Sequence, residues 1–244
     1  MTPFLWGLLF ATAGAALVLA TRQGTPGAAA LGFAVSLALV LGFGPGVMAP
    51  VALFVLGSGL LTRLGRARKE RLRTAEKDRG RRGAAHVAAK LGVPALLGAA
   101  AALMPALASW LGGGAAASLA AAFADTSATE IGPLVAGQVF RVSGGRVTRA
   151  AHGAPGGVSA AGLAGGALAA LALAVLARGT GLGPAEGAPW AAAGAGFGAA
   201  LVESAVAGTG VGRGLGPIGR NLFLSALAAA AGVALAALVS PGGG

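Results

Sequence analysis

The chain has few charged residues and no cysteine. Charged side chains make up 10% of its 244 residues, whereas a soluble globular domain carries roughly 25%. Together with a mean hydropathy of +0.80, this shortage of charge argues against a water-soluble globule. The absence of cysteine excludes disulfide bonds, thiolate metal sites and a cysteine nucleophile.

Small residues are abundant instead. The sequence has 45 glycines, and 56% of its residues are hydrophobic. The glycines follow no three-residue period, which excludes a collagen-like chain, and the apolar content is too high for a disordered one. The composition therefore predicts an integral membrane protein.

The length allows seven or eight membrane spans, because a bilayer core of roughly 30 Å needs about 20 helical residues at 1.5 Å each. We predict an all-α polytopic helix bundle in which some helices are short or broken at glycines. The predicted breaks are Gly42-Phe43-Gly44-Pro45 and Gly112-Gly113-Gly114. The predicted spans cover residues 3–20, 27–41, 46–62, 84–111, 115 to the Asp125 region, 157–177, 189–209 and 217–239.

The first apolar segment, Met1 to Ala20, is also considered as a signal peptide. It lacks a basic leading region and a small-x-small cleavage site, so we interpret it as a span. Eleven of the 18 Lys and Arg lie between Arg63 and Lys90. Since basic loops stay inside, residues 63–83 are predicted to face the cytoplasm, and residues 130–156 and 210–216 follow on the same side. We expect a multi-pass protein of the inner or plasma membrane.

The basic stretch from Arg63 to Arg82 contains no aromatic residue. Nucleic-acid binding is one interpretation of its charge. A loop that sets the topology and lies against anionic lipid headgroups is the interpretation we favour, without a nucleic-acid partner.

Three of the seven acids lie in or beside apolar segments: Asp125, Glu130 and Glu203. The others lie in the basic stretch or, for Glu186, in a Gly/Pro turn. An ionisable residue at membrane depth costs at least about 2.5 kcal/mol, so it indicates function by default. Such oxygen ligands suit Mg²⁺.

Asp125 and Glu130 sit at the cytoplasmic end of the predicted fifth span, among the hydroxyls of Thr126, Ser127 and Thr129. Positions five apart on a regular helix point about 140° away from each other. The two carboxylates therefore converge only if the segment unwinds or both line one polar cavity. A helix cap at the membrane interface is the alternative interpretation.

A glycine-containing segment, Arg149 to Ser159, opens the next span. Free backbone N–H groups at a helix start, with an arginine nearby, bind anions. A flexible loop with an N-cap explains the same residues. Further along, Glu203-Ser204 precedes Arg213 and Gly219-Arg220-Asn221 at another cytoplasmic membrane end. Together these ends predict a site for phosphates and metal at the membrane surface.

At these residues the sequence resembles an integral-membrane family that includes phytyl-phosphate kinase and transmembrane protein 19. Its Asp-Thr-x-x-Ser-Glu-Ile/Leu-Gly block is similar to Asp125 through Gly132, with Thr129 in place of serine. Its Gly-Thr-x-Gly-Gly/Ala-Val-Ser/Thr block is similar to Gly153 through Ser159, where Ala154 and Pro155 depart from it. Its later Asp-Ser pair and asparagine correspond to Glu203-Ser204 and Asn221.

The resemblance implies a phosphoryl transfer from a nucleoside triphosphate, CTP by similarity to phytol and dolichol kinases, to an isoprenoid monophosphate. We therefore expect three N-terminal spans in residues 1–62, the basic loop at 63–83 and a membrane bundle at 84–244 that carries the catalytic site. We expect Asp125, Glu130 and Glu203 to be catalytic: Asp125 and Glu130 hold Mg²⁺ with the triphosphate, and Glu203 supports the metal or orients Asn221. The residues expected to bind phosphate or substrate are Thr126, Thr129, Arg149, Gly153, Gly156, Gly157, Ser159, Arg213 and Asn221.

Two other functions stay open. Glycine-broken helices and intramembrane carboxylates also occur in transporters, so a flippase or transporter for a small or lipidic anion is the alternative. A structural membrane subunit is the third. Its three acids should tolerate amide replacement.

Overall fold

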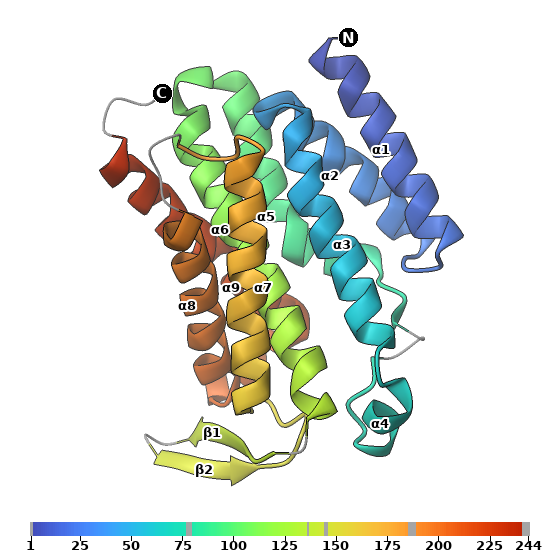
Figure 1. Ribbon diagram of the computed structural model, residues 1–244, viewed down its shortest axis with the longest axis vertical. Helices are drawn as coiled ribbons and strands as arrows, with labels where there is room; N and C mark the ends of the chain where they lie inside the picture. The colour runs from blue at the N-terminus through green and yellow to red at the C-terminus, as the bar shows by residue number, and fades with distance from the viewer. Residues whose placement is uncertain (1, 77–79, 136, 144–145, 185–188, 241–244) are drawn as a thin grey trace.

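The computed structural model describes residues 2–76, 80–135, 137–143, 146–184 and 189–240 (Figure 1). Glu186 in the predicted turn lies outside these residues. The α-helices are α1 (Pro3–Ala20), α2 (Pro26–Phe43), α3 (Met48–Arg63), α4 (Arg66–Arg71), α5 (Ala84–Leu103), α6 (Ala108–Ile131), α7 (Ala160–Gly179), α8 (Pro189–Ala207) and α9 (Gly210–Val239). Short 3-10 turns are η1 (Pro45–Val47), η3 (Pro105–Leu107) and η4 (Gly132–Leu134), and the strands are β1 (Val139–Ser143) and β2 (Arg146–Ala150).

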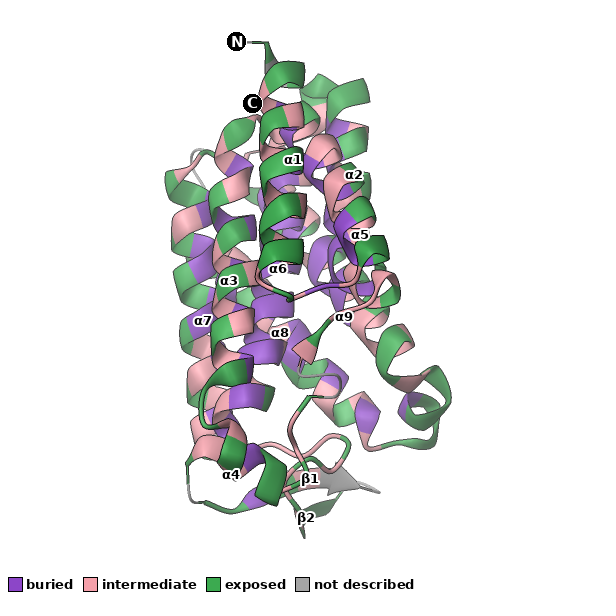
Figure 2. Cartoon of the chain, turned by 90° about the vertical axis from the view of Figure 1, so that its right-hand side faces the viewer, coloured by how far each residue is buried: buried purple, intermediate pink, exposed green. Residues whose placement is uncertain are grey.

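Within the described ranges, seven helices are long and apolar enough to cross a membrane, and α1 adds a shorter apolar helix. This confirms the predicted all-α polytopic bundle. Large apolar side chains such as Leu60, Leu96 and Leu238 are exposed on its outside, where lipid replaces water as their neighbour. The helix α1 lies at the edge, packs on α2 and is largely exposed (Figure 2).

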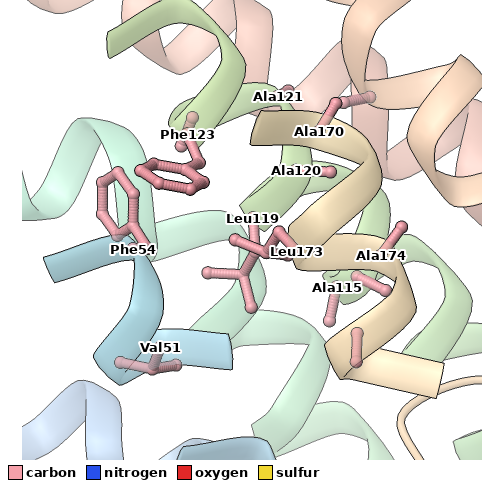
Figure 3. Close-up of a cluster of buried hydrophobic side chains, with 14 of the residues drawn as sticks. Val51, Phe54, Ala115, Leu119, Ala120, Ala121, Phe123, Ala170, Leu173 and Ala174 are labelled. Carbon is pink, nitrogen blue, oxygen red and sulfur yellow. The ribbon is translucent and has the colours of Figure 1, made fainter. Parts of the chain in front are cut away.

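The helix α6 forms the centre of the bundle and packs against α5, α7, α8 and α9. Its length from Gly112 to Ala124 is continuously buried. Most of these residues are alanine or glycine, and small side chains let neighbouring backbones approach closely in a membrane. Larger residues fill the spaces that remain: Leu119 lies by Leu173 of α7, and Phe123 meets Phe54 of α3 edge to face (Figure 3).

The predicted break at Gly112-Gly113-Gly114 is wrong, because α6 runs through these glycines without interruption. They form a packing surface instead. A Cβ on Gly113 would lie 2.6 Å from Ala236 Cβ, and one on Gly114 would lie 2.9 Å from Ala229 O, both on α9. The chain breaks earlier, at Pro105, so the predicted span 84–111 ends at Leu103.

Other helix ends follow local sequence signals. The predicted break before Pro45 is present, with Gly44 at φ +78°. Thr25 caps α2 through its side chain and is followed by Pro26, a combination that favours a helix start. In α9, Gly216 has φ +62° directly before Pro217, which kinks the helix where the sequence predicted it to begin.

The segments following α3, α6 and α8 meet at one end of the bundle (Figure 1). Arg68 Nε of α4 donates to Pro133 O at 2.7 Å, and Gly156 packs against Ser204 and Gly208 at the end of α8. The segment 130–156, predicted as a loop, contains the antiparallel hairpin β1–β2. This end of the bundle carries most of the residues singled out in the sequence.

Candidate functional site

A lysine from α5 and two residues of α6 form a polar contact inside the bundle. Lys90 Nζ donates to Asp125 Oδ2 at 2.9 Å and to Thr126 Oγ1 at 2.8 Å. Thr126 in turn donates to Ala122 O at 2.9 Å, so its hydroxyl is fixed. Lys90 and Thr126 are buried, whereas 25% of the Asp125 side chain is exposed. A polar ligand can therefore reach the Asp125 carboxylate while the ion pair with Lys90 stays intact.

A second ion pair joins α8 to α9. Arg220 Nε lies 2.9 Å from Glu203 Oε1, and Arg220 also donates to Gly212 O at 3.4 Å. Glu203 further interacts electrostatically with Asp125 and Lys90. We call Lys90, Asp125, Glu203 and Arg220 the four-helix charge cluster, because each comes from a different helix of the bundle.

Glu130 belongs to a separate buried cluster. Lys69 Nζ of α4 donates to Glu130 Oε2 at 2.6 Å, and Thr62 Oγ1 of α3 donates to Oε1 at 2.6 Å. Lys69 is 1% exposed and also donates to Leu61 O. Because α6 is unbroken, Asp125 and Glu130 point to different partners. The structure does not bring this predicted metal pair together.

The glycine segment before α7 forms tight turns and also packs closely against neighbouring segments. Gly153 and Gly156 have φ +80° and +75°, a conformation that favours glycine. A Cβ on Gly156 would lie 2.5 Å from Ser204 O. Gly157 contacts Val139 of β1, and Ser159 caps α7 by accepting from Gly162 N at 3.2 Å. Close packing and backbone conformation therefore explain the glycines of this segment without a bound ligand.

The remaining predicted binding residues lie on the hairpin, on α9 and on α6. Arg149 is exposed on β2, opposite Phe140. Arg213 is exposed in the first turn of α9 and donates to Gly208 O at 3.3 Å. Asn221 is half-buried and follows Arg220 in the chain, and Thr129 is exposed.

The carboxylates limit where a metal ion can bind. Among the described residues there is no group of three or more His, Cys, Asp and Glu side chains, so a cation would depend on one or two carboxylates and on ligand oxygens. Mg²⁺ is often bound in this way. Asp125 and Glu203 are the better candidates: the two carboxylates lie within range of mutual electrostatic repulsion, which a cation between them would relieve, and Asp125 is partly exposed. Glu130 does not fit, because both oxygens accept from buried donors.

Sequence reasoning missed Lys69, Lys90 and Thr62, and it did not include Arg220 among the binding residues. Lys90 was counted with the basic stretch, yet it lies inside an apolar helix. That position was the available signal, since an intramembrane lysine is as unusual as an intramembrane acid. Lys69 had no such signal, because it is one of many cations in its segment.

Comparisons with known proteins agree with the membrane character of this chain. The model of one family, described as integral membrane protein DUF92, matches residues 7–212. Comparisons with curated proteins and with solved structures each give no match.

Proposed function

This chain belongs to the DUF92 family of integral membrane proteins, and on that premise we propose that it is a membrane phosphotransferase. It moves a phosphoryl group from a nucleoside triphosphate, with CTP as the expected donor, to an isoprenoid monophosphate such as phytyl phosphate. The product is the isoprenoid diphosphate. The similarity of Asp125 through Gly132 to the phytyl-phosphate kinase block supports this choice of reaction.

The four-helix charge cluster is the observation that carries the proposal. Phosphoryl transfer needs positioning and neutralisation of negative charge more than covalent chemistry. Lys90 and Arg220 supply cations, Asp125 and Glu203 supply metal ligands, and all four lie within membrane-spanning helices. An ion pair that only joins two helices needs one acidic and one basic side chain, whereas this cluster contains two of each. Two interacting pairs with a partly exposed carboxylate suit a polyanionic ligand with its counter-ion.

Each residue then has a defined task. Asp125 and Glu203 would hold Mg²⁺, which would neutralise part of the negative charge of the phosphates. Arg220 exchanges its carboxylate partner for phosphate oxygens when the donor binds, and Lys90 supplies positive charge beside Asp125. Arg213 and Arg149 lie at the same end of the bundle, where they attract the triphosphate, and Asn221 contributes an amide next to Arg220.

The reaction does not require a strong general base. An oxygen of the isoprenoid monophosphate is already ionised and attacks the γ-phosphorus of the donor. The new P–O bond forms as the bond from the γ-phosphorus to its bridging oxygen breaks, and the nucleoside diphosphate leaves with that electron pair. This agrees with a chain that has two histidines and no cysteine.

The test is product formation by the purified full-length protein in detergent. The reaction contains γ-³²P-labelled CTP, Mg²⁺ and geranylgeranyl monophosphate, and the lipid product is separated by thin-layer chromatography. We expect labelled geranylgeranyl diphosphate. No diphosphate with any of the four ribonucleoside triphosphates or with phytyl phosphate contradicts the proposal. Nucleotide-independent uptake of the lipid phosphate by proteoliposomes would replace it with the transporter alternative.

A further inference from the structure

A cavity of about 90 Å³ lies between α1, α2, α3 and α5. We call it the N-terminal cavity. Neither the glycine segment nor the predicted phosphate-binding arginines Arg149 and Arg213 line it. Val18, Phe54 and Leu91 contribute apolar surface, and Gly24, Ala28 and Gly32 keep the space open.

The polar part of this lining is basic. Arg82 and Lys90 both border the cavity, with Gln23 and His86 beside them. None of the described lining residues is acidic. Anions are therefore favoured over cations, and the apolar remainder of the wall favours an anion that carries a hydrocarbon group.

A buried hydroxyl gives an independent sign of a ligand. Ser58 lines the cavity and is 3% exposed. Its Oγ has no hydrogen-bond partner among the described residues. Buried polar atoms are nearly always hydrogen-bonded, so the unpartnered Ser58 hydroxyl beside a basic cavity indicates a polar group that occupies this space.

Lys90 connects the cavity to the four-helix charge cluster. Its side chain lines the cavity, while its ammonium group contacts Asp125. An anionic group next to Lys90 in the cavity would thus lie next to the carboxylate proposed to hold the metal. The N-terminal helices would then contribute to ligand binding, because α1, α2 and α3 supply most of the apolar wall of the cavity.

We infer that the N-terminal cavity binds the acceptor: the phosphate of a single-chain lipid monophosphate together with the first part of its hydrocarbon chain. Arg82, Lys90 and Ser58 bind the phosphate, and Val18, Phe54 and Leu91 contact the chain. This inference rests on the proposed function for the identity of the acceptor. The donor nucleotide binds at Arg220 and Arg213, neither of which lines the cavity.

The test measures binding without catalysis. Tritiated geranylgeranyl monophosphate is added to the full-length protein in detergent, without nucleotide or Mg²⁺, and bound ligand is counted by scintillation proximity. We expect saturable binding. Geranylgeraniol, inorganic phosphate and the two-chain lipid phosphatidic acid should each compete at least about tenfold more weakly, a difference that corresponds to about 1.4 kcal/mol.

Two pairs of variants locate the site. Arg82→Gln should weaken binding at least about tenfold, whereas Arg81→Gln, an exposed neighbour outside the cavity lining, should not. Gly32→Leu should block the cavity, because a side chain at Gly32 meets open space there. Gly194→Leu on α8 is its control, since that glycine is exposed and also has free space around it.

The outcomes separate this inference from the proposed function. Unchanged binding in both Arg82→Gln and Gly32→Leu overturns the cavity as the acceptor site, even if the wild-type protein makes diphosphate. Equal competition by phosphatidic acid also overturns it, because the site would then be a general lipid contact. Cavity-dependent binding without any diphosphate product overturns the phosphotransferase and leaves the cavity as a lipid-phosphate site.

Discussion

Lys90 of α5 and Asp125 of α6 form an ion pair of 2.9 Å whose two ends differ in exposure. The lysine side chain is 7% exposed and the aspartate side chain 25%. The cation is thus fixed inside the bundle, while the anion is reachable. This asymmetry makes the pair suited to exchange a protein partner for a bound ligand. We also expect the pair to stabilise the fold.

A double-mutant cycle measures that contribution. Lys90→Met leaves Asp125 without its cation and should destabilise the protein, whereas Lys90→Met combined with Asp125→Asn should recover part of the loss. We expect a coupling energy of about 1–3 kcal/mol from unfolding in detergent. The exposed pair Arg66–Glu70, at 2.7 Å, is the control and should give about 0.5 kcal/mol. Equal coupling energies in the two cycles would show that burial does not strengthen the ion pair between Lys90 and Asp125.

The buried ion pair of Lys69 with Glu130 predicts a stability effect in the basic stretch. Lys69→Met should destabilise the protein by about 3–5 kcal/mol, because it leaves the Glu130 carboxylate uncompensated. The control is Arg71→Met on the same short helix, where the side chain is exposed. Thermal unfolding in detergent checks both variants. If Arg71→Met lowers the melting temperature as much as Lys69→Met, the basic stretch is anchored by its overall charge.

Much of the fold follows from composition and length. Apolar segments separated by Gly-Pro and basic loops predicted the membrane spans, because a bilayer core requires a fixed helix length. The error at Gly112-Gly113-Gly114 has a physical reason. A glycine run breaks an isolated helix, but in a bundle it allows α6 and α9 to approach closely, and tertiary packing decides the outcome.

The candidate site was less predictable, because partners on other helices are invisible in a linear sequence. Asp125 and Glu203 could be singled out as intramembrane acids, but only the packing of α6 against α8 brings their charges within electrostatic range of each other. Glu130 looked equally suitable. Its ion pair with Lys69 forms because α4 lies against the end of α6. No local sequence pattern specifies that arrangement.

The close packing of Gly156 predicts that it cannot be replaced. In Gly156→Ala the new methyl group would meet Ser204 O at 2.5 Å, and the residue would have to keep a φ of +75°. We expect destabilisation of about 1–3 kcal/mol from the steric conflict, in addition to the backbone strain. Gly181→Ala is the matched control, because its φ is +81° with no atom within 4 Å. The melting temperature in detergent should fall further in Gly156→Ala than in Gly181→Ala. Equal decreases would mean that backbone strain alone, without a steric conflict, explains the loss of stability.

Replacement of Mg²⁺ by Mn²⁺ tests the assignment of the metal ligands. Electron paramagnetic resonance reports free Mn²⁺ in a titration of the protein with a non-hydrolysable CTP analogue. Asp125→Asn and Glu203→Gln should each weaken Mn²⁺ binding at least about tenfold, because each removes a carboxylate from the proposed site. The exposed Glu70→Gln is the control. Weaker binding in Glu130→Gln but not in Glu203→Gln would restore Asp125 and Glu130 as the metal pair.

Single-turnover transfer of ³²P from CTP to geranylgeranyl monophosphate tests the central claim most directly, because it follows the chemical step at the four-helix charge cluster. Wild-type protein and Glu70→Gln should form labelled geranylgeranyl diphosphate at equal rates. Asp125→Asn and Glu203→Gln, shown to be folded by their melting curves, should react at least about 10²–10³-fold more slowly. Full transfer activity in folded Asp125→Asn and Glu203→Gln would contradict the account.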